Sequence, residues 1–118
     1  MNFINKVIIS TLAVLLVGSI LPGVHVENIY VALLVALVLA FLNSIVKPVL
    51  ILFTLPITLF TLGLFLLVIN AIIILLADKL IDQFSVSSFW TAVLFSMILS
   101  LVTSVFETLA GSRKDNSH

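Results

Sequence analysis

The charged residues of this chain are few and unevenly spaced, and their spacing limits the folds that the chain can adopt. Only five Lys or Arg and five Asp or Glu occur among 118 residues. They leave four uncharged runs of 20, 19, 30 and 24 residues, at 7–26, 28–46, 48–77 and 83–106. A helix that crosses the hydrocarbon core of a bilayer needs about 20 apolar residues. The pattern therefore predicts an all-α integral membrane protein with four transmembrane helices.

These helices need nearly the whole chain, so we expect a single transmembrane domain over residues 1–110. The hydrophilic segment 111–118 is expected to be a polar cytoplasmic tail. We interpret the apolar start of the chain as a retained span, because a small-residue cleavage site is poorly developed there and further spans follow. The expected spans are about 7–24, 28–46, 57–77 and 88–107.

Composition excludes several functional classes. Hydrophobic residues make up 63% of the chain and charged residues 8%, whereas a soluble domain carries about 25% charged residues. The formal net charge is zero, so we expect no nucleic-acid partner. Cysteine is absent and both histidines, His25 and His118, stand alone, so we expect no metal and no cofactor. No cluster of residues is arranged for catalysis, which argues against an enzyme. The expected partner is the lipid bilayer.

The basic residues predict the orientation, since Lys and Arg beside short loops stay preferentially on the cytoplasmic side. If both termini are cytoplasmic, four of the five basic residues lie inside, and Lys79 alone lies outside. The segments 22–28 and 78–88 are then external turns. We expect the charged side chains at 78, 79 and 82 to be solvated there.

The third uncharged run is too long for one straight crossing. Its 30 residues would extend about 45 Å as a helix, against a hydrocarbon core of about 30 Å. Pro48 and Pro56 each remove a backbone donor and disfavour helix in the preceding residue. We therefore expect a half-helix over 48–55, buried short of a full crossing or forming a kinked extension, followed by a span over 57–77.

Small residues recur every fourth position in two of the expected spans, and we call these series the two ladders. Such spacing allows helices to approach closely in membranes, where interhelical hydrogen bonds also contribute. Packing within the chain or against a second copy in a homo-oligomer is therefore expected. The ladders are Ala32, Ala36, Ala40 and Ser44 in the second span, and Ala92, Ser96, Ser100 and Ser104 in the fourth.

Several polar residues stand within or beside the spans. Lys47 ends the second span, with Asn43 one turn deeper, and Glu107 ends the fourth. Lys47 and Glu107 would have similar depth and could form an ion pair, or Lys47 could extend to the headgroups. Asn70 lies well inside the third span, and Gly63 shares its helical face. Asn70 is expected to bond to a neighbouring helix brought close at Gly63, or to belong to a functional site.

A set of motifs between residues 43 and 104 resembles the phage holin family, superfamily IV, whose members are small four-span bacterial membrane proteins. The resemblance implies location in the bacterial inner membrane and carries no catalytic or binding residues. Holins open that membrane to lytic enzymes, but many relatives are chromosomal proteins of uncharacterised role. The matching residues are Asn43, Lys47-Pro48, Leu55-Pro56, Thr58, Thr61-Leu62-Gly63-Leu64-Phe65, Asn70-Ala71 and FSVSSFWTA at 84–92.

Two functional hypotheses follow from the sequence. The first is a self-associating, holin-like membrane protein that affects membrane permeability, and it rests on the two ladders. The second is a non-lytic envelope protein that handles a lipid or small solute, or supports another membrane protein. It rests on the broken third run, with Pro56, Gly63 and Asn70.

Overall fold

The computed structural model describes residues 2–110, so the expected tail at 111–118 lies outside the described residues. The described chain is mostly helical, as predicted. Its elements are α1 (Phe3–Ile20), β1 (Val24–Val26), α2 (Ile29–Phe41), a π-helical turn (Leu42–Val46), α3 (Lys47–Phe53), α4 (Leu55–Phe60), α5 (Phe65–Leu80), β2 (Phe84–Val86) and α6 (Phe89–Ala110).

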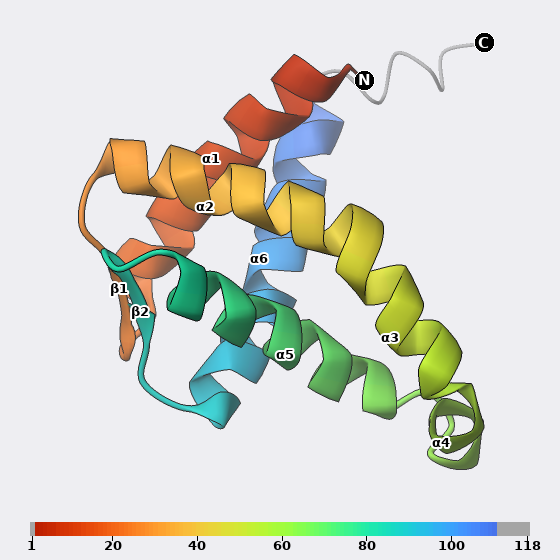
Figure 1. Ribbon diagram of the computed structural model, residues 1–118. Helices are drawn as coiled ribbons and strands as arrows, with labels where there is room; N and C mark the ends of the chain where they lie inside the picture. Colours follow the sequence, from red (N-terminus) through yellow and green to blue (C-terminus); the bar gives the residue numbers. More distant parts are fainter. Residues whose placement is uncertain (1, 111–118) are drawn as a thin grey trace, which may run out of the picture.

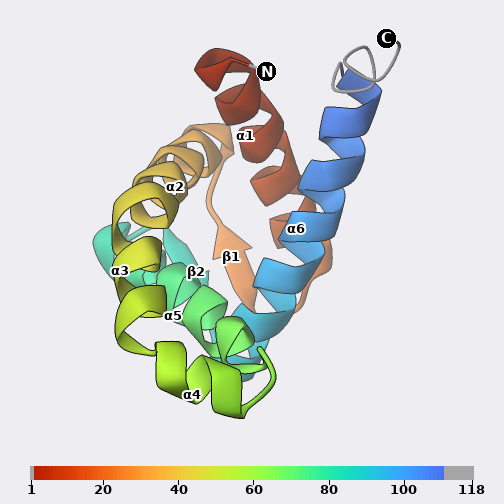
Figure 2. The same ribbon diagram turned by 90° about the vertical axis from the view of Figure 1, so that its right-hand side faces the viewer.

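Two antiparallel helix pairs build the fold (Figure 1). Helices α1 and α6 form one pair, while α2, continued by α3, and α5 form the other. The second pair crosses the first, as the view in Figure 2 shows. The first turn of α1 and the last turn of α6 lie at the same end of their pair, away from the two strands.

A two-stranded antiparallel ribbon joins the loop after α1 to the loop after α5. Strand β1 pairs with β2, with Val24 opposite Val86. Beside the strands, the backbone N–H of Ser87 donates to the carbonyl of Gly23 at 2.7 Å. The sequence indicated two separate external turns. The structure instead joins them into one cap, because pairing satisfies the backbone groups of each loop with those of the other.

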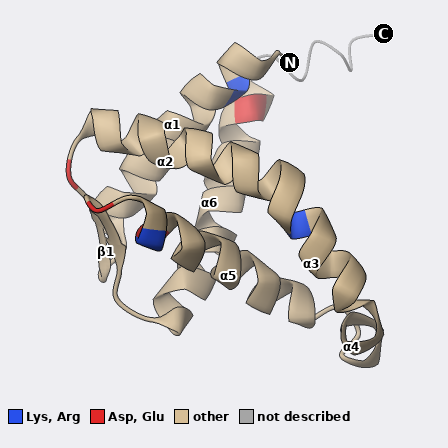
Figure 3. Cartoon of the chain, in the orientation of Figure 1, with Lys and Arg blue, Asp and Glu red and all other residues tan. Residues whose placement is uncertain are grey.

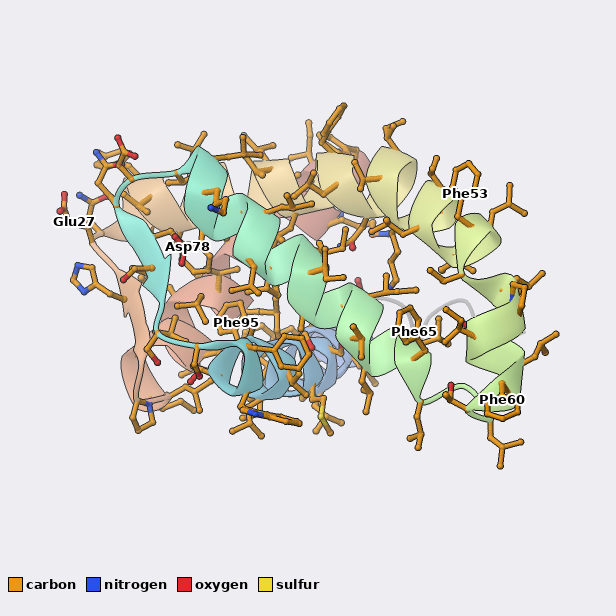
Figure 4. All side chains as sticks on the ribbon, turned by 60° about the horizontal axis from the view of Figure 1, so that its bottom comes forward. Glu27, Phe53, Phe60, Phe65, Asp78 and Phe95 are labelled. Atoms are coloured by element: carbon orange, nitrogen blue, oxygen red, sulfur yellow. The ribbon has the colours of Figure 1, made fainter. Side chains whose placement is uncertain are left out.

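The core of the fold lies beside this ribbon. Phe84 of β2 and Phe95 of α6 are fully buried, with ring centroids 5.8 Å apart. Figure 4 shows Phe95 in the interior of the molecule. Fully buried alanines of α2, α5 and α6, Ala32, Ala71 and Ala92, belong to the same core cluster and let the backbones approach. The aromatic pair therefore fills the space where the two helix pairs meet the ribbon.

The outer faces of the helices are strongly apolar: large hydrophobic side chains are exposed along α1, α2 and α6, and Leu80 is exposed at the end of α5. Such a surface suits lipid rather than water. Within residues 2–110, three helical stretches are long and apolar enough to cross a membrane: Phe3–Ile20, Ile29–Phe53 and Phe89–Ala110. The fourth long helix, α5, has 16 residues, which gives a length of about 24 Å.

Pro48 does not separate two helices, contrary to the sequence-based expectation. Helices α2 and α3 form one rod with the π-helical turn between them, and this rod covers the 25 residues Ile29–Phe53. The ring of a proline clashes with the carbonyl four residues earlier. Here the wider π-helical turn ends at Val46, directly before Lys47-Pro48, and such a local adjustment lets the helix continue. Of the two alternatives for 48–55, the structure thus has an extension of the preceding helix and not a separate half-helix, and the rod ends at Phe53. The limits of the membrane spans stay a prediction.

The chain changes direction twice between α3 and α5. Pro56 lies in the first turn of α4, and the turn after this helix places Leu62 and Gly63 at φ values of 58° and 89°. The N–H of Gly63 donates to the carbonyl of Thr58 at 2.8 Å, which closes the end of α4. The expected span 57–77 is therefore two helices, and its long part begins only at Phe65.

A threonine hydroxyl supports this second turn. Oγ1 of Thr61 donates to the carbonyl of Ile57 at 3.0 Å and accepts from the N–H of Phe65 at 3.2 Å. Ser and Thr side chains can replace lost helical bonds where water is scarce. Phe53 and Phe60 project outward at this end of the molecule (Figure 4), and Phe60 is 90% exposed. Irregular backbone here is thus compatible with apolar surroundings.

Candidate functional site

A groove of about 430 Å³ lies between α1, α2 and α6, and we call it the terminal groove. Its walls come from the N-terminal part of α1, the end of α2 with the π-helical turn, and the C-terminal half of α6. Its size falls within the range of small-molecule sites, roughly 300–1,000 Å³. Seven of its lining side chains are polar: Lys6, Ser10, Asn43, Ser44, Ser100, Thr103 and Ser104.

The helix arrangement explains why this groove stays open. Helix α1 packs against both α2 and α6, whereas α2 and α6 make no comparable contact with each other. The residues that face this space are mainly small, so their side chains do not fill it.

The two ladders divide between the core and the groove. Their first members, Ala32 and Ala92, are fully buried. Their last members, Ser44 and Ser104, are exposed and line the terminal groove. The ladders therefore support helix packing inside the chain only near the ribbon. At the other end they leave a hollow with hydroxyl groups on two of its sides.

The polar side chains of the terminal groove have no partners among the described residues. None of the seven forms a side-chain hydrogen bond within residues 2–110. Hydroxyls elsewhere in the helices do bond to their own backbone, as Thr11 Oγ1 does to the carbonyl of Val7 at 2.7 Å and Ser96 Oγ to that of Val93 at 2.9 Å. Five of the seven side chains are exposed, and Ser10 and Thr103 are half-buried, so their polar atoms are accessible to another molecule. The groove is therefore suited to hold the polar part of another molecule or water.

Lys6 is the one charged residue that lines the terminal groove. Figure 3 shows most charged residues toward the ends of the helices and in the connecting loops, with long uncharged stretches of helix between them. The groove thus combines one positive charge with neutral amide and hydroxyl groups.

The candidate site residues predicted from the sequence lie in different parts of the structure. Asn43 lies in the terminal groove. Lys47 and Pro48 begin α3, and Glu107 lies in the last turns of α6, outside the residues that line the groove. Lys47 and Glu107 are both half-buried, and no ion pair joins them in the described chain. The ion pair is thus not formed within residues 2–110.

Asn70 and Gly63 do not lie on one helix in the described chain. Gly63 lies in the turn before α5, and a Cβ atom added to it would meet nothing within 4 Å. Glycine is needed at this position because the turn has a positive φ, not because another helix approaches closely. Asn70 is half-buried in α5, and its side chain forms no hydrogen bond with a described residue. The expected bond from Asn70 to a ladder residue is therefore not formed within the described chain.

Sequence reasoning used Lys6 only as a marker of orientation and did not consider Ser10. The two residues are four positions apart, so they share one face of α1. That spacing was the available signal. Its significance depends on where α2 and α6 cross α1, which the sequence pattern does not specify. Among the described residues, no group of three His, Cys, Asp or Glu side chains could hold a metal ion.

Comparisons with known proteins agree with this membrane architecture. The curated protein "Uncharacterized membrane protein YvlD" of Bacillus subtilis is 38% identical over 97 residues, which cover 81% of this chain and 82% of that protein. "Uncharacterized protein SCO3922" of Streptomyces coelicolor is 46% identical over 81 residues, or 65% of each chain. No solved structure gives a significant match. The family described as "Mycobacterial 4 TMS phage holin, superfamily IV", which is not an enzyme family, matches residues 1–105. This chain therefore belongs to the four-span phage holin superfamily IV.

Proposed function

We propose that this protein is a non-lytic component of the bacterial cytoplasmic membrane that binds the polar end of a membrane amphiphile in the terminal groove. The observation that carries this proposal is the set of seven polar side chains without partners around one hollow. A lipid or a related amphiphile would satisfy them, while its apolar part would contact the exposed apolar faces of the surrounding helices.

The proposed topology has four crossings and both termini in the cytoplasm. The excess of basic residues in the expected inner segments supports it. The position of the start of α1 and the end of α6 at one end of the molecule agrees with it. In this orientation the terminal groove opens near the cytoplasmic leaflet, at the level where lipid headgroups lie. α5 makes the fourth crossing, with its short length accommodated by local thinning of the bilayer.

The distribution of charge argues against a water-filled pore as the function of a single chain. A pore needs a continuous polar lining, whereas the polar lining found here is confined to one groove with one charged residue. We therefore expect expression to leave the membrane intact at low copy number. Dye entry across an expression series measures this property. Abrupt, all-or-none entry at low copy number would contradict the non-lytic proposal.

Filling the groove tests the proposal directly. Ser100→Leu places a large apolar side chain in the groove, while Ser19→Leu makes the same change at an exposed position of α1 that does not line it. Lipids that copurify with each variant are identified by mass spectrometry, and circular dichroism checks helix content. We expect the wild type and Ser19→Leu to retain a lipid that Ser100→Leu loses. Equal retention by all three, with equal helix content, would refute binding in the groove.

A second candidate function is self-association, which the exposed ends of the two ladders favour. Ser44, Ser100 and Ser104 are small and exposed, and such positions let a helix of another copy approach closely. Assemblies of this kind would perturb the bilayer, as the family name implies. Because the chain contains no cysteine, Ser104→Cys offers a single site for crosslinking in membranes. A crosslinked dimer that depends on oxidant would support this candidate, and a monomer throughout would oppose it.

A further inference from the structure

We propose that the terminal groove binds a phosphate group and that the ammonium group of Lys6 selects it. This inference rests on the proposed function and specifies the polar end of the ligand. Lys6 is the only charged residue among those that line the groove, and it faces amide and hydroxyl groups contributed by two other helices.

The hydrogen-bonding capacity of the groove matches a phosphate. Lys6 offers three donors, the amide of Asn43 two and each serine or threonine hydroxyl one. The oxygens of an ionised phosphate are acceptors, and lysine binds phosphate as a compact positive charge. These donors are not used inside the described chain. Binding a phosphate would therefore require no existing hydrogen bond to break.

The placement of the carboxylates supports an anionic ligand. Glu27, Asp78 and Asp82 lie in or beside the loops and strands that form the ribbon, distant in the fold from the start of α1. Glu107 is half-buried in α6, one helical turn beyond the groove residues Thr103 and Ser104, and is not itself among the residues that line the groove. Within the described residues, no acidic side chain therefore lines the groove to repel a phosphate.

Two sources could supply this group: the headgroup of a phospholipid or a free phosphate. The groove also contains large apolar residues, Phe3, Leu39 and Leu99, beside its polar ones. Acyl chains or a glycerol backbone would contact these side chains, whereas a free phosphate would leave them uncovered. The experiment therefore compares lipids that differ only in the phosphate and adds inorganic phosphate as a competitor.

Native mass spectrometry of the full-length protein in detergent measures binding of phosphatidic acid and of diacylglycerol with the same acyl chains. We expect phosphatidic acid to bind about tenfold more tightly, the scale of one hydrogen bond to a charged group. Lys6→Met should remove most of this difference and Lys6→Arg should retain it. Lys47→Met is the matched control, because it removes the same charge at a residue outside the groove lining.

Each outcome has a defined meaning. Equal binding of both lipids by the wild type would overturn the phosphate inference but leave the proposed amphiphile site standing, while no binding of either lipid would overturn both. An equal loss in Lys6→Met and Lys47→Met would also overturn the inference, because general surface charge would then explain selectivity. Displacement of phosphatidic acid by inorganic phosphate would support the phosphate site with a free anion as its ligand.

Discussion

The backbone N–H of Val86 donates a hydrogen bond of 2.9 Å to Oδ2 of Asp78. This bond joins the last turns of α5 to strand β2 and thereby holds the ribbon against the helix that precedes it. Asp78 is half-buried. The carboxylate therefore has a structural contact in addition to the solvation expected from its place in an external turn.

We predict that Asp78→Ala destabilises the protein through this bond. A hydrogen bond to a charged group contributes about 1.5–3 kcal/mol, and partial exposure reduces this, so we expect a loss of about 1 kcal/mol. Asp82→Ala, which removes the same charge at an exposed position just after α5, is the control. Thermal unfolding in detergent, followed by circular dichroism, compares the two. Equal stability of the two variants would mean that the Asp78 bond contributes nothing measurable.

Phe84 provides a second test of the ribbon as part of the core. It is fully buried against Phe95, whereas Phe60 of α4 is 90% exposed. Phe84→Ala should cost about 3–5 kcal/mol because it leaves a cavity, while Phe60→Ala should leave thermal stability in detergent nearly unchanged. A similar small effect of both substitutions would show that the ribbon is not packed as described.

Substitutions of Gly63 can separate the effect of backbone strain in the turn from the effect of side-chain packing. Its φ is 89°, and a Cβ atom would have open space around it. Gly63→Ala should therefore cost about 1–2 kcal/mol through backbone strain alone, and Gly63→Asn should cost less because asparagine tolerates positive φ. Thermal unfolding of the two purified variants measures the difference. If Asn is as harmful as Ala, side-chain bulk rather than backbone conformation is the cause.

The helical class was predictable from the sequence, whereas the π-helical turn and the ribbon were not recognised. Charge spacing reports where long apolar helices lie, because charges are costly in lipid. Pro48 lowers helix stability but does not reveal whether a neighbouring turn can widen to accommodate it. The ribbon had a signal, since Val24 and Val26 alternate with a polar residue, as Phe84 and Val86 do. Strands of three residues are too short for such alternation to be decisive.

The candidate site was predicted only in part, because grooves depend on how helices cross. Asn43 and the ladder serines were identified from spacing within single helices, and the structure brings them to one hollow with Lys6. The pairings that required a second helix, between Lys47 and Glu107 and between Asn70 and a ladder residue, are not formed in the described chain. Helical periodicity indicates which residues share a face, but it does not tell which other face they meet.

We predict that the ribbon is external and the start of α1 cytoplasmic. Single cysteines at exposed positions test this in a chain without native cysteine: Ser85→Cys in β2 and Asn5→Cys in α1. An impermeant thiol reagent added to intact spheroplasts should label Ser85→Cys, and should label Asn5→Cys only after permeabilisation. Labelling of Asn5→Cys in intact spheroplasts would contradict the proposed topology.

Substitution of Asn70 tests whether its amide has a hydrogen-bond partner outside the described chain. Its side chain is half-buried in α5 and bonds to no described residue, so Asn70→Leu removes no hydrogen bond within that part of the chain. In lipid, replacing an unpaired amide by an apolar group of similar size should be neutral or stabilising. We therefore expect the thermal stability of Asn70→Leu in detergent to equal or exceed that of the wild type.

Ala71→Leu in the same helix, where the residue is fully buried, should be clearly destabilised by overpacking. A loss of stability in Asn70→Leu as large as that in Ala71→Leu would show that the amide has a partner, in a second copy or a bound lipid.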